Sequence, residues 1–384
     1  MNFDRIKDRS NTGAIKWKIN DDKNRTGAKV IPLTIADMEF PSPDCIIQAV
    51  IERLAGGIFG YTAVTEEYKE KVRWWYERRF GWNTDECEIY MSNGVIDGFN
   101  KCIDSLCAED ERVIFQTPAY PPFFSMCRQG VMNPLLYDKE SNEYTFDFDH
   151  LELLARDEKN TVLMLCHPHN PTGRVWKEWE LIRIADICFR NGVTIVTDEI
   201  HGDLVRKGAE HTPLLKLFPD GDIIACVAPS KTFNLAGLST SHIIVPKSMD
   251  KRLKPKMKSQ RINPLAMAAI EGAYTEEGEE WLEELKGYID GNMEYIGERL
   301  KKELPGIPFT IPEGTYLLWL NMKKYMKETE EFSRRAIEYG RVQIEEGEMF
   351  GAPGFVRINT ACPRSMLEEA MNRFIATVRR YYTA

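Results

Sequence analysis

The sequence of 384 residues lacks the features that mark several large classes of protein. No run approaches the roughly 18 apolar residues of a membrane-spanning helix, and the first residues lack the apolar core of a signal peptide. A formal net charge of -9 leaves no positive footprint for a nucleic acid backbone. Internal repeats and low-complexity segments are absent as well. We therefore expect a cytoplasmic protein that acts on a small molecule, with neither a nucleic acid nor a membrane as its partner.

The cysteines and histidines of the chain argue against a disulfide framework and against a metal site. The nine cysteines are an odd number and are scattered through apolar segments, which fits reduced, buried thiols better than a disulfide framework. The cluster Cys166-His167-Pro168-His169 has the residue types of a metal site. No second group of ligands follows it at zinc spacing, and the sequence has no His-Glu-x-x-His. We expect no metal.

Short apolar runs alternate with helical stretches from about residue 85 to residue 280. The runs at 113–116, 161–166, 193–197 and 223–227 are rich in β-branched residues and close with polar or turn-forming ones, so they predict buried strands. The clearest helix is predicted at 176–191. Strands that alternate with helices predict a mostly parallel sheet covered on both faces, with ligands beyond the carboxyl ends of the strands.

The pattern changes after about residue 276. An acidic, strongly helical stretch runs to residue 304, and prolines then punctuate short predicted strands at 316–320 and 355–359. Apolar residues at helical spacing predict a last helix over 365–381. We expect a large domain over 46–279. The smaller domain would be discontinuous and would combine 280–384 with the extended segment 1–45.

Lys231 is the best candidate for a covalent cofactor anchor. It lies in Ala228-Pro-Ser-Lys-Thr-Phe-Asn-Leu-Ala-Gly, directly after the predicted strand at 223–227. Burial and neighbouring positive charge at the rim of a sheet lower the pKa of a lysine enough for its amine to attack a carbonyl. Pyridoxal phosphate is the carbonyl compound that we expect.

Polar residues that could hold the rest of such a cofactor follow other strands. Asp198 ends the strand at 193–197, where a buried carboxylate needs a cation such as a protonated pyridine nitrogen; a helix cap is its alternative role. Asn170, in Asn-Pro-Thr-Gly, could donate to the phenolate oxygen of the ring. The turn 92–98, Ser-Asn-Gly-Val-Ile-Asp-Gly, opens a helix whose free N–H groups would receive a phosphate, although Asn-Gly alone often marks only a turn.

Five longer motifs together carry a family resemblance. They begin at Ala36 (Ala-Asp-Met-Glu-Phe-Pro-Ser-Pro), Thr117 (Thr-Pro-Ala-Tyr-Pro-Pro-Phe), Asp198 (Asp-Glu-Ile-His-Gly-Asp-Leu), Ser230 (Ser-Lys-Thr-Phe-Asn-Leu-Ala-Gly) and Val356 (Val-Arg-Ile-Asn-Thr-Ala-Cys-Pro-Arg-Ser). Over essentially the whole chain the sequence resembles the MalY/PatB-type cystathionine β-lyases, or carbon-sulfur lyases, within the fold-type I class I/II aminotransferase superfamily. The resemblance implies an α/β fold whose large domain has a mostly parallel seven-stranded sheet between helices, beside a smaller α+β domain.

The resemblance also implies roles for individual residues. Lys231 would bind the cofactor covalently and move the substrate α proton, while Tyr120 would stack on the ring. The cofactor as a whole would be held by Gly94, Val95, Tyr120, Asn170, Asp198, His201, Ser230 and Lys231. Arg357 would grip the substrate carboxylate through a bidentate fork, and Asp37 would lie near the substrate. Tyr61 of the partner subunit would reach both the cofactor phosphate and the substrate pocket, which requires a homodimer. Loop packing is the alternative role for both tyrosines.

The chain departs from related patterns at three places. Many transaminases of the superfamily carry a serine three residues before the lysine and an arginine eight residues after it, both on the phosphate. This chain has Ala228 and Ser239 there, so the helix end and hydroxyl groups must balance most of the phosphate charge. His201 replaces a tyrosine common in transaminases, as it does in the lyases. Trp17-Lys18 stands where the lyases commonly have Trp-Asp.

The residues and the resemblance together predict α,β-elimination on sulfur amino acids. Cystathionine would give homocysteine, pyruvate and ammonia, and cysteine would give hydrogen sulfide, pyruvate and ammonia. Transamination between amino acids and 2-oxo acids uses the same residues and stays an alternative. A regulatory binding protein of the same fold is a further alternative. The sequence does not specify the preferred thiol leaving group.

Overall fold

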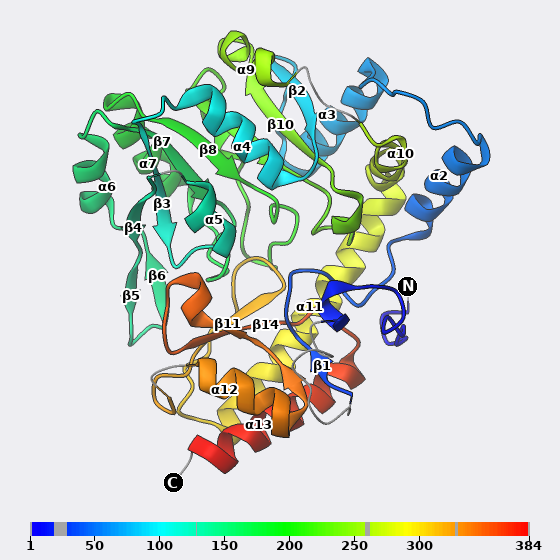
Figure 1. The fold of residues 1–384 in the computed structure, drawn as a ribbon, viewed down its shortest axis with the longest axis vertical. Helices are drawn as coiled ribbons and strands as arrows, with labels where there is room; N and C mark the ends of the chain where they lie inside the picture. Colours follow the sequence, from blue (N-terminus) through cyan, green and yellow to red (C-terminus); the bar gives the residue numbers. More distant parts are fainter. Residues whose placement is uncertain (1, 19–28, 128, 258–261, 327–328, 383–384) are drawn as a thin grey trace.

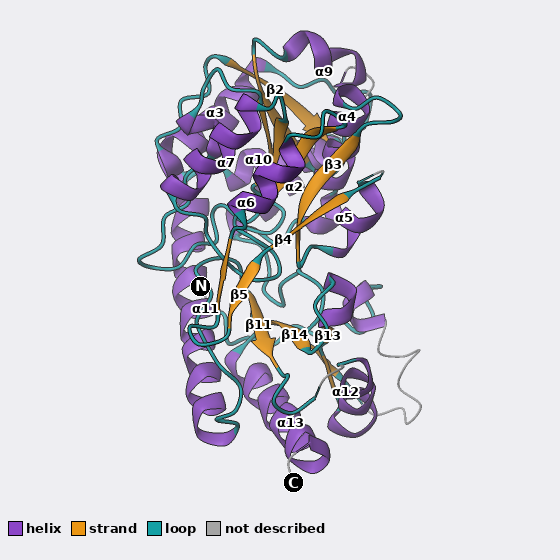
Figure 2. Cartoon of the chain, turned by 90° about the vertical axis from the view of Figure 1, so that its left-hand side faces the viewer, coloured by secondary structure: helices purple, strands orange, loops and turns teal. Residues whose placement is uncertain are grey.

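The computed structural model describes residues 2–18, 29–127, 129–257, 262–326 and 329–382. Figure 1 shows two stacked parts, with most of the chain around a large sheet at the top and a smaller layered part at the bottom. The helices of the upper part are α2 (Asp44–Ala55), α3 (Glu66–Phe80), α4 (Val95–Leu106), α5 (Pro121–Met126), α6 (Phe148–Ala155), α7 (Glu178–Arg190), α8 (Leu214–Leu217), α9 (Asp250–Met257) and α10 (Pro264–Ala273). The long helix α11 (Glu276–Glu303) joins the two parts (Figure 2).

The central sheet has seven strands in the order β2-β10-β9-β8-β7-β3-β4. Their bounds are β2 (Cys87–Ser92), β3 (Arg112–Thr117), β4 (Val131–Pro134), β7 (Asn160–Cys166), β8 (Thr194–Asp198), β9 (Ile223–Val227) and β10 (Ser241–Pro246). Only β10 runs antiparallel to its neighbours β2 and β9. The mostly parallel seven-stranded sheet and the α/β class are therefore confirmed.

Both faces of this sheet are buried because its strands carry apolar residues at successive positions. In β7, Val162 and Met164 face a cluster that includes α4, while Leu163 and Leu165 face the cluster that includes α7. Successive strand residues point to opposite faces, so a continuous apolar run is what a doubly covered strand requires. This packing fixes the strands and leaves their polar carboxyl ends to form a site.

The smaller part is built on an antiparallel sheet in the order β11-β14-β13. Its elements are β11 (Leu317–Asn321), α12 (Glu330–Arg335), a π-helical turn (Ala336–Gly340), β12 (Val342–Gln343), β13 (Glu345–Glu346), a 3-10 helix (Gly347–Phe350), β14 (Phe355–Asn359) and α13 (Arg364–Tyr382). The N-terminal β1 (Ile31–Pro32) pairs with β12. This pairing attaches residues 31–32 to the smaller part, whereas Phe3 and Phe40 join the core of the upper part. The remaining elements are the hairpin β5 (Leu136–Asp138) and β6 (Glu143–Thr145), and a 3-10 turn at Ala236–Leu238.

The hydrophobic cores follow the two parts, and α11 contributes to both. Trp281 and Leu285 in its first half join the core of the upper part, whereas Ile296 and Leu300 join the core of the lower part. The chain thus passes from one core to the other within a single helix. The domain bounds 46–279, 1–45 and 280–384 stay a prediction.

The predicted elements match the observed ones closely. The helix expected at 176–191 is α7, and its end is followed by Gly192 with a φ of 71°. The strands expected at 113–116, 161–166, 193–197 and 223–227 are β3, β7, β8 and β9. Among the described residues, no helix is long and apolar enough to span a bilayer.

Candidate active site

Five strands of the central sheet end at the same edge, and each leads into a predicted site residue. β2 leads to Gly94, β3 to Tyr120, β7 to Asn170 and β9 to Lys231, while Asp198 is the last residue of β8. These strands all run in one direction, so their carboxyl ends meet. The site forms where ligands bind in doubly wound sheets.

A cavity of about 400 Å³ lies at this edge. It is lined by Ile35, Ala36, Gly94, Val95, Ile96, Tyr120, Pro121, Pro122, Asn170, Asp198, Ile200, His201, Ser230, Lys231, Ala236, Ser239, Thr240, Glu345, Met349 and Arg357. Every predicted site residue except Asp37 and Tyr61 lines it. The cavity therefore joins residues of both parts of the molecule, since β13 and β14 supply Glu345 and Arg357.

Lys231 reaches into the cavity with an amine that is easy to deprotonate. Burial lowers the pKa of its ammonium from 10.5 to about 8, and the positive charge of Arg357 acts in the same direction. The Nζ atom donates to the carbonyl oxygen of Ala36 at 2.6 Å. A substantial fraction of the amine is then neutral near pH 8, as a nucleophile or a base requires.

Asp198 is a buried carboxylate at the cavity wall, and the nearby charge of Lys231 only partly offsets the effect of burial on its pKa. Its Oδ1 accepts the backbone N–H of Ile200 at 3.3 Å, and the Cys166 thiol lies 4.0 Å from Oδ2. Within the described chain no ion pair to Asp198 is found, and burial raises its pKa from 3.8 to about 7. The hydrogen bond from Ile200 resembles that of a helix cap, the alternative role considered for Asp198. The other carboxylate oxygen still lacks a positively charged partner.

Arg357 and Asn170 form a joined pair on another wall. The Arg357 guanidinium donates from one terminal nitrogen to Asn170 Oδ1 at 2.7 Å. The Asn170 amide nitrogen is then the side-chain group left to donate to a ligand. This arrangement agrees with the expected donation from Asn170 to a ring oxygen.

The loop that carries Asn170 is held by close backbone packing. Gly173 has a φ of 72°, and a Cβ there would lie 2.3 Å from Pro312 Cβ. Its carbonyl accepts the N–H of Gly314 at 2.8 Å. Only glycine allows this approach, so the smaller part presses directly against the loop and keeps Asn170 in place.

Two buried polar atoms at the cavity wall have no hydrogen-bond partner, namely His201 Nδ1 and Thr240 Oγ1. Burial lowers the pKa of His201 to about 3, helped by the charges of Lys231 and Arg357, so its ring is neutral. The N-cap of α4 is Gly94, with a φ of 89° and no side-chain cap, and a Cβ there would meet no atom within 4 Å. An uncapped helix N-terminus beside free hydroxyl groups is suited to a phosphate.

These observations fit pyridoxal phosphate. Asp198 lacks the cation that a protonated ring nitrogen would provide, and Lys231 has a reactive amine. Thr240, Ser230 and the α4 N-terminus offer donors to a phosphate. Among the described residues that line the cavity, Lys231 and Arg357 are the only cationic side chains. Many transaminases have a phosphate-binding arginine at the position of Ser239, and no other arginine of this lining takes its place.

Two predicted residues lie elsewhere. The Asp37 carboxylate pairs with Arg9 at 2.9 Å and with Lys16 at 3.4 Å, although it remains close enough to raise the pKa of Lys231 slightly. The loop between α2 and α3 lies at the outer edge of the molecule (Figure 1). Tyr61 belongs to this loop by sequence, and its side chain is 99% exposed. Tyr61 is not among the residues that line the cavity, and its proposed role in a partner subunit stays a prediction.

Sequence reasoning missed two polar neighbours of the site. Glu345 in β13 contacts Arg357, and the Tyr316 hydroxyl donates to Ala36 O at 2.9 Å, the oxygen that also receives Lys231. Glu345 lies in Gln-Ile-Glu-Glu-Gly and Tyr316 in Gly-Thr-Tyr-Leu, stretches without a local catalytic signature. Glu345 reaches the cavity through its place in β13, and Tyr316, directly before β11, reaches Ala36 of the cavity lining.

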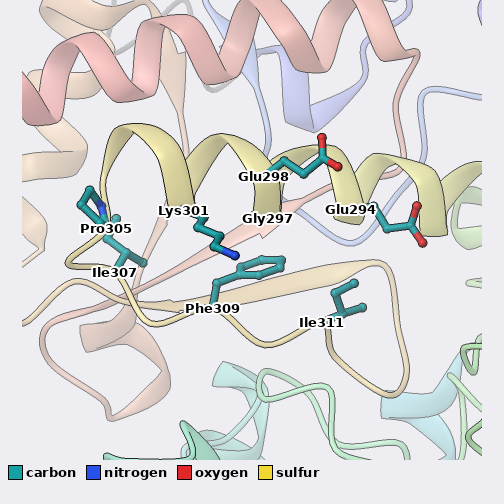
Figure 3. Close-up of a pocket in the computed structure, with 8 residues that line it drawn as sticks. All are labelled: Glu294, Gly297, Glu298, Lys301, Pro305, Ile307, Phe309 and Ile311. Carbon is teal, nitrogen blue, oxygen red and sulfur yellow. The ribbon is translucent and has the colours of Figure 1, made fainter.

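Another hollow, of about 510 Å³, lies along α11 (Figure 3). It is lined by Glu294, Gly297, Glu298, Lys301, Pro305, Ile307, Phe309 and Ile311. Phe309 packs on Gly297, where a Cβ would lie 2.4 Å from the ring. No predicted site residue and no end of a central-sheet strand lines this hollow. We therefore assign the chemistry to the cavity of about 400 Å³ at the edge of the central sheet.

The histidines of Cys166-His167-Pro168-His169 are engaged within the protein. His167 Nε2 lies 3.2 Å from the carbonyl oxygen of Thr212, and His169 Nδ1 lies 2.8 Å from the Thr172 hydroxyl. In the part of the chain that the structure describes, no group of three or more potential metal ligands gathers.

Comparison with known proteins gives full-length matches. The family model described as aminotransferase class I and II matches residues 28–374. The chain is 37% identical to cystathionine beta-lyase PatB of Bacillus subtilis (strain 168), over 98% of this chain and 100% of that protein. It is 31% identical to protein MalY of Escherichia coli (strain K12), over 99% of each.

A solved structure extends the match to three dimensions. Cystalysin from Treponema denticola, whose crystal structure contains a pyridoxal 5'-phosphate cofactor, superposes with a TM-score of 0.93 at 33% identity, covering 99% of both chains. The resemblance predicted from the five motifs is therefore confirmed along the whole length.

Proposed function

We infer that this chain, which belongs to the aminotransferase class I and II family, is a pyridoxal-phosphate-dependent carbon-sulfur lyase that carries out α,β-elimination on sulfur amino acids. The observation that carries this function is the convergence of Lys231, Asp198 and Arg357 on one cavity in a chain similar over its full length to cystathionine beta-lyases. Cystathionine and cysteine are the substrates that we propose.

The residues that would hold the cofactor follow from the geometry. Asp198 would hold a positive charge at the ring nitrogen and thereby relieve its own buried charge. The Asn170 amide and the neutral His201 ring would donate to polar atoms of the ring. Half-buried Tyr120 would form a wall against one ring face. When bound, pyridoxal phosphate supplies an electron sink for the electron pair left on the substrate α carbon.

The substrate would be oriented by Arg357 and deprotonated by Lys231. The fork of the guanidinium binds a carboxylate with two parallel hydrogen bonds, which fixes the α carbon relative to the cavity wall. Lys231 Nζ would take the α proton, because it is the neutral amine nearest the reacting centre. The electron pair of the C–S bond then leaves with sulfur, and the remaining fragment hydrolyses to pyruvate and ammonia.

The test of this function measures two products from one substrate. Purified protein loaded with pyridoxal phosphate is incubated with L-cystathionine, and pyruvate and free thiol are quantified together. We expect both in a one-to-one ratio without any added 2-oxo acid. Amino transfer that depends on an added 2-oxo acid, with no thiol released, would instead identify an aminotransferase.

The working enzyme is proposed to be a homodimer with shared sites. The outer face of α2 and the loop after it expose the apolar side chains of Ile47, Ile51, Leu54, Ile58, Phe59 and Tyr61. A contiguous exposed apolar surface of this kind marks an interface. Tyr61 of the partner subunit would complete the phosphate end of the cavity, where no cationic side chain of the described chain lies.

Mixing two inactive variants should restore activity if the sites are shared. Lys231→Ala lacks the base and Tyr61→Ala lacks the residue given to the partner, so each homodimer should be defective. After subunit exchange, a mixed dimer has one site with both defects and one with neither, giving roughly a quarter of the wild-type activity at equal mixing. Steady-state thiol release before and after mixing measures the gain. Two differently tagged samples of Lys231→Ala, mixed in the same way, serve as the control, and an unchanged rate in the test mixture would exclude sharing.

We place the protein in the cytoplasm. All nine cysteines are unpaired in the structure, and most are buried, which fits a reducing compartment.

A further inference from the structure

Glu345 is positioned across a strand pair from Arg357. β13 and β14 run antiparallel, and Glu345 is the residue directly opposite Arg357 in their register. The Glu345 side chain is 12% exposed and that of Arg357 is 3% exposed. Both line the cavity. The pair is therefore a buried charge pair within the candidate active site, and the elimination reaction as described above assigns no role to its acid.

The contacts of the guanidinium determine which edge remains for a ligand. Glu345 Oε2 accepts from Arg357 Nε at 2.7 Å, and the same oxygen lies 2.5 Å from one terminal nitrogen. Asn170 Oδ1 accepts from the other terminal nitrogen at 2.7 Å. An arginine has five N–H donors in a planar fork, one on Nε and two on each terminal nitrogen, and each of the three nitrogens faces one of these two acceptors. One N–H remains on each terminal nitrogen, which is the edge that a carboxylate binds with two hydrogen bonds.

Further contacts hold this orientation. The Phe350 ring lies under the guanidinium, with 4.5 Å between the Arg357 Cζ atom and the ring centroid. The second oxygen of Glu345 accepts the backbone N–H of Ile35 at 3.3 Å, so the carboxylate is tied to a neighbouring segment that also lines the cavity. Phe350 restricts the plane of the fork, and Glu345 restricts its rotation within that plane.

We propose that Glu345 is a positioning residue that turns the Arg357 fork so that its two terminal N–H groups face the substrate α-carboxylate. This inference rests on the proposed function, since it assigns the carboxylate to Arg357. Without Glu345 the guanidinium loses the partner on its Nε edge and can rotate about its side-chain bonds. Recognition of the carboxylate would then weaken, while the cofactor contacts of Lys231 and Asp198 would stay unchanged.

The experiment compares a substrate that has a free α-carboxylate with the same substrate in which that carboxylate is masked as an ester. Rates of thiol or sulfide release are measured for L-cysteine and L-cysteine methyl ester with the holoenzyme and its variants, and the ratio of kcat/KM for acid over ester is formed. In Glu345→Ala this ratio should fall by about 10- to 100-fold, because a hydrogen-bonded charge contact is lost. The loss should appear mainly as a higher KM for the acid, and cofactor absorbance should be unchanged.

Two further variants keep the test decisive. Glu346→Gln alters the adjacent acid of the same strand, whose side chain points to the opposite face, and its ratio should equal that of the wild type. Glu345→Gln has nearly the same shape and keeps an acceptor for Nε, so it should fold and give an intermediate ratio. If both Glu345 variants bind cofactor normally and retain the wild-type ratio, the proposal is wrong.

A binding measurement separates this inference from the proposed function. L-alanine has an α-carboxylate but no leaving group, and its binding is followed by the change in cofactor absorbance. Its apparent Kd should rise about 10- to 100-fold in Glu345→Ala. If the wild type binds L-alanine but releases no thiol from any sulfur amino acid, the proposed function fails while the role of Glu345 is still tested. An unchanged Kd would overturn the role of Glu345 alone.

Discussion

Replacing Lys231 by alanine is expected to reduce thiol release from L-cystathionine by on the order of 10⁴-fold, because the variant loses both the covalent anchor and the base that takes the α proton. No other amine lines the cavity within the described residues. The measurement is the steady-state rate, together with mass spectrometry after borohydride reduction, which should find cofactor attached to the wild type and none attached to the variant.

Lys247→Ala is the matched control for that variant. Lys247 pairs with Glu86 at the surface, and half of its side chain is exposed, so its loss should leave both readouts unchanged. A Lys231→Ala protein that cleaves at the wild-type rate would remove the basis of the proposed chemistry. The same variant also addresses the alternative of a regulatory protein of this fold, because a function based on binding alone should survive the loss of the amine.

Replacing Asp198 by asparagine is expected to have two opposite effects. Activity should fall by on the order of 10²- to 10³-fold, since a charge placed to stabilise the ring is lost. Without cofactor, however, the variant should be more stable than the wild type at pH 8, because it removes a buried charge that has no partner. A residue whose loss harms catalysis and improves stability is typical of a functional position.

The pH dependence of this stability gain follows from the raised pKa of Asp198. Below pH 3.8 the carboxyl group is protonated in both the folded and the unfolded protein, so it causes no penalty. As pH rises toward 7, the unfolded group ionises first and the folded protein loses stability. The gap between a pKa of 3.8 and one of about 7 corresponds to roughly 4 kcal/mol at most.

Thermal unfolding of the cofactor-free proteins tests this sign. The midpoint of Asp198→Asn should exceed that of the wild type at pH 8, and the difference should shrink as pH is lowered toward 4. Added pyridoxal phosphate should stabilise the wild type more than the variant. Asp203→Asn is the contrasting control, because Asp203 is buried but pairs with Arg79 at 3.1 Å and accepts from Trp75 at 3.1 Å. Its replacement should destabilise the protein at pH 8, and a similar loss in Asp198→Asn would contradict the prediction.

The fold could be predicted where local pattern and final burial agree. Strands such as β7 and β9 are buried on both faces, so apolar side chains follow one another and the pattern is unmistakable. β2 was missed because it lies at the edge of the sheet and its burial partly alternates. β10 was missed as well; it is the one strand of the central sheet that runs antiparallel to its neighbours, and nothing local in Ser-His-Ile-Ile-Val-Pro indicates its direction.

The site could be predicted to a similar extent. Lys231, Asp198 and Asn170 each stand at the end of a recognisable strand, where a polar residue is conspicuous against apolar neighbours. Arg357 was identified by family resemblance, since it lies within a strand and has no local signal. Glu345 and Tyr316 were not identified at all, because their importance comes from partners that lie 12 and 280 residues away along the chain.

By itself the sequence determined the class of fold, the order along the chain of the strands that carry site residues, and the identity of the groups that can do chemistry. Each of these depends on residue type and spacing along the chain. Only the tertiary structure decided how those groups behave. The lowered pKa of Lys231, the raised pKa of Asp198 and the direction of the Arg357 fork all arise from burial and from neighbours supplied by other elements. Desolvation and charge contacts depend on distance in space, and folding is what brings these residues within a few ångströms of one another.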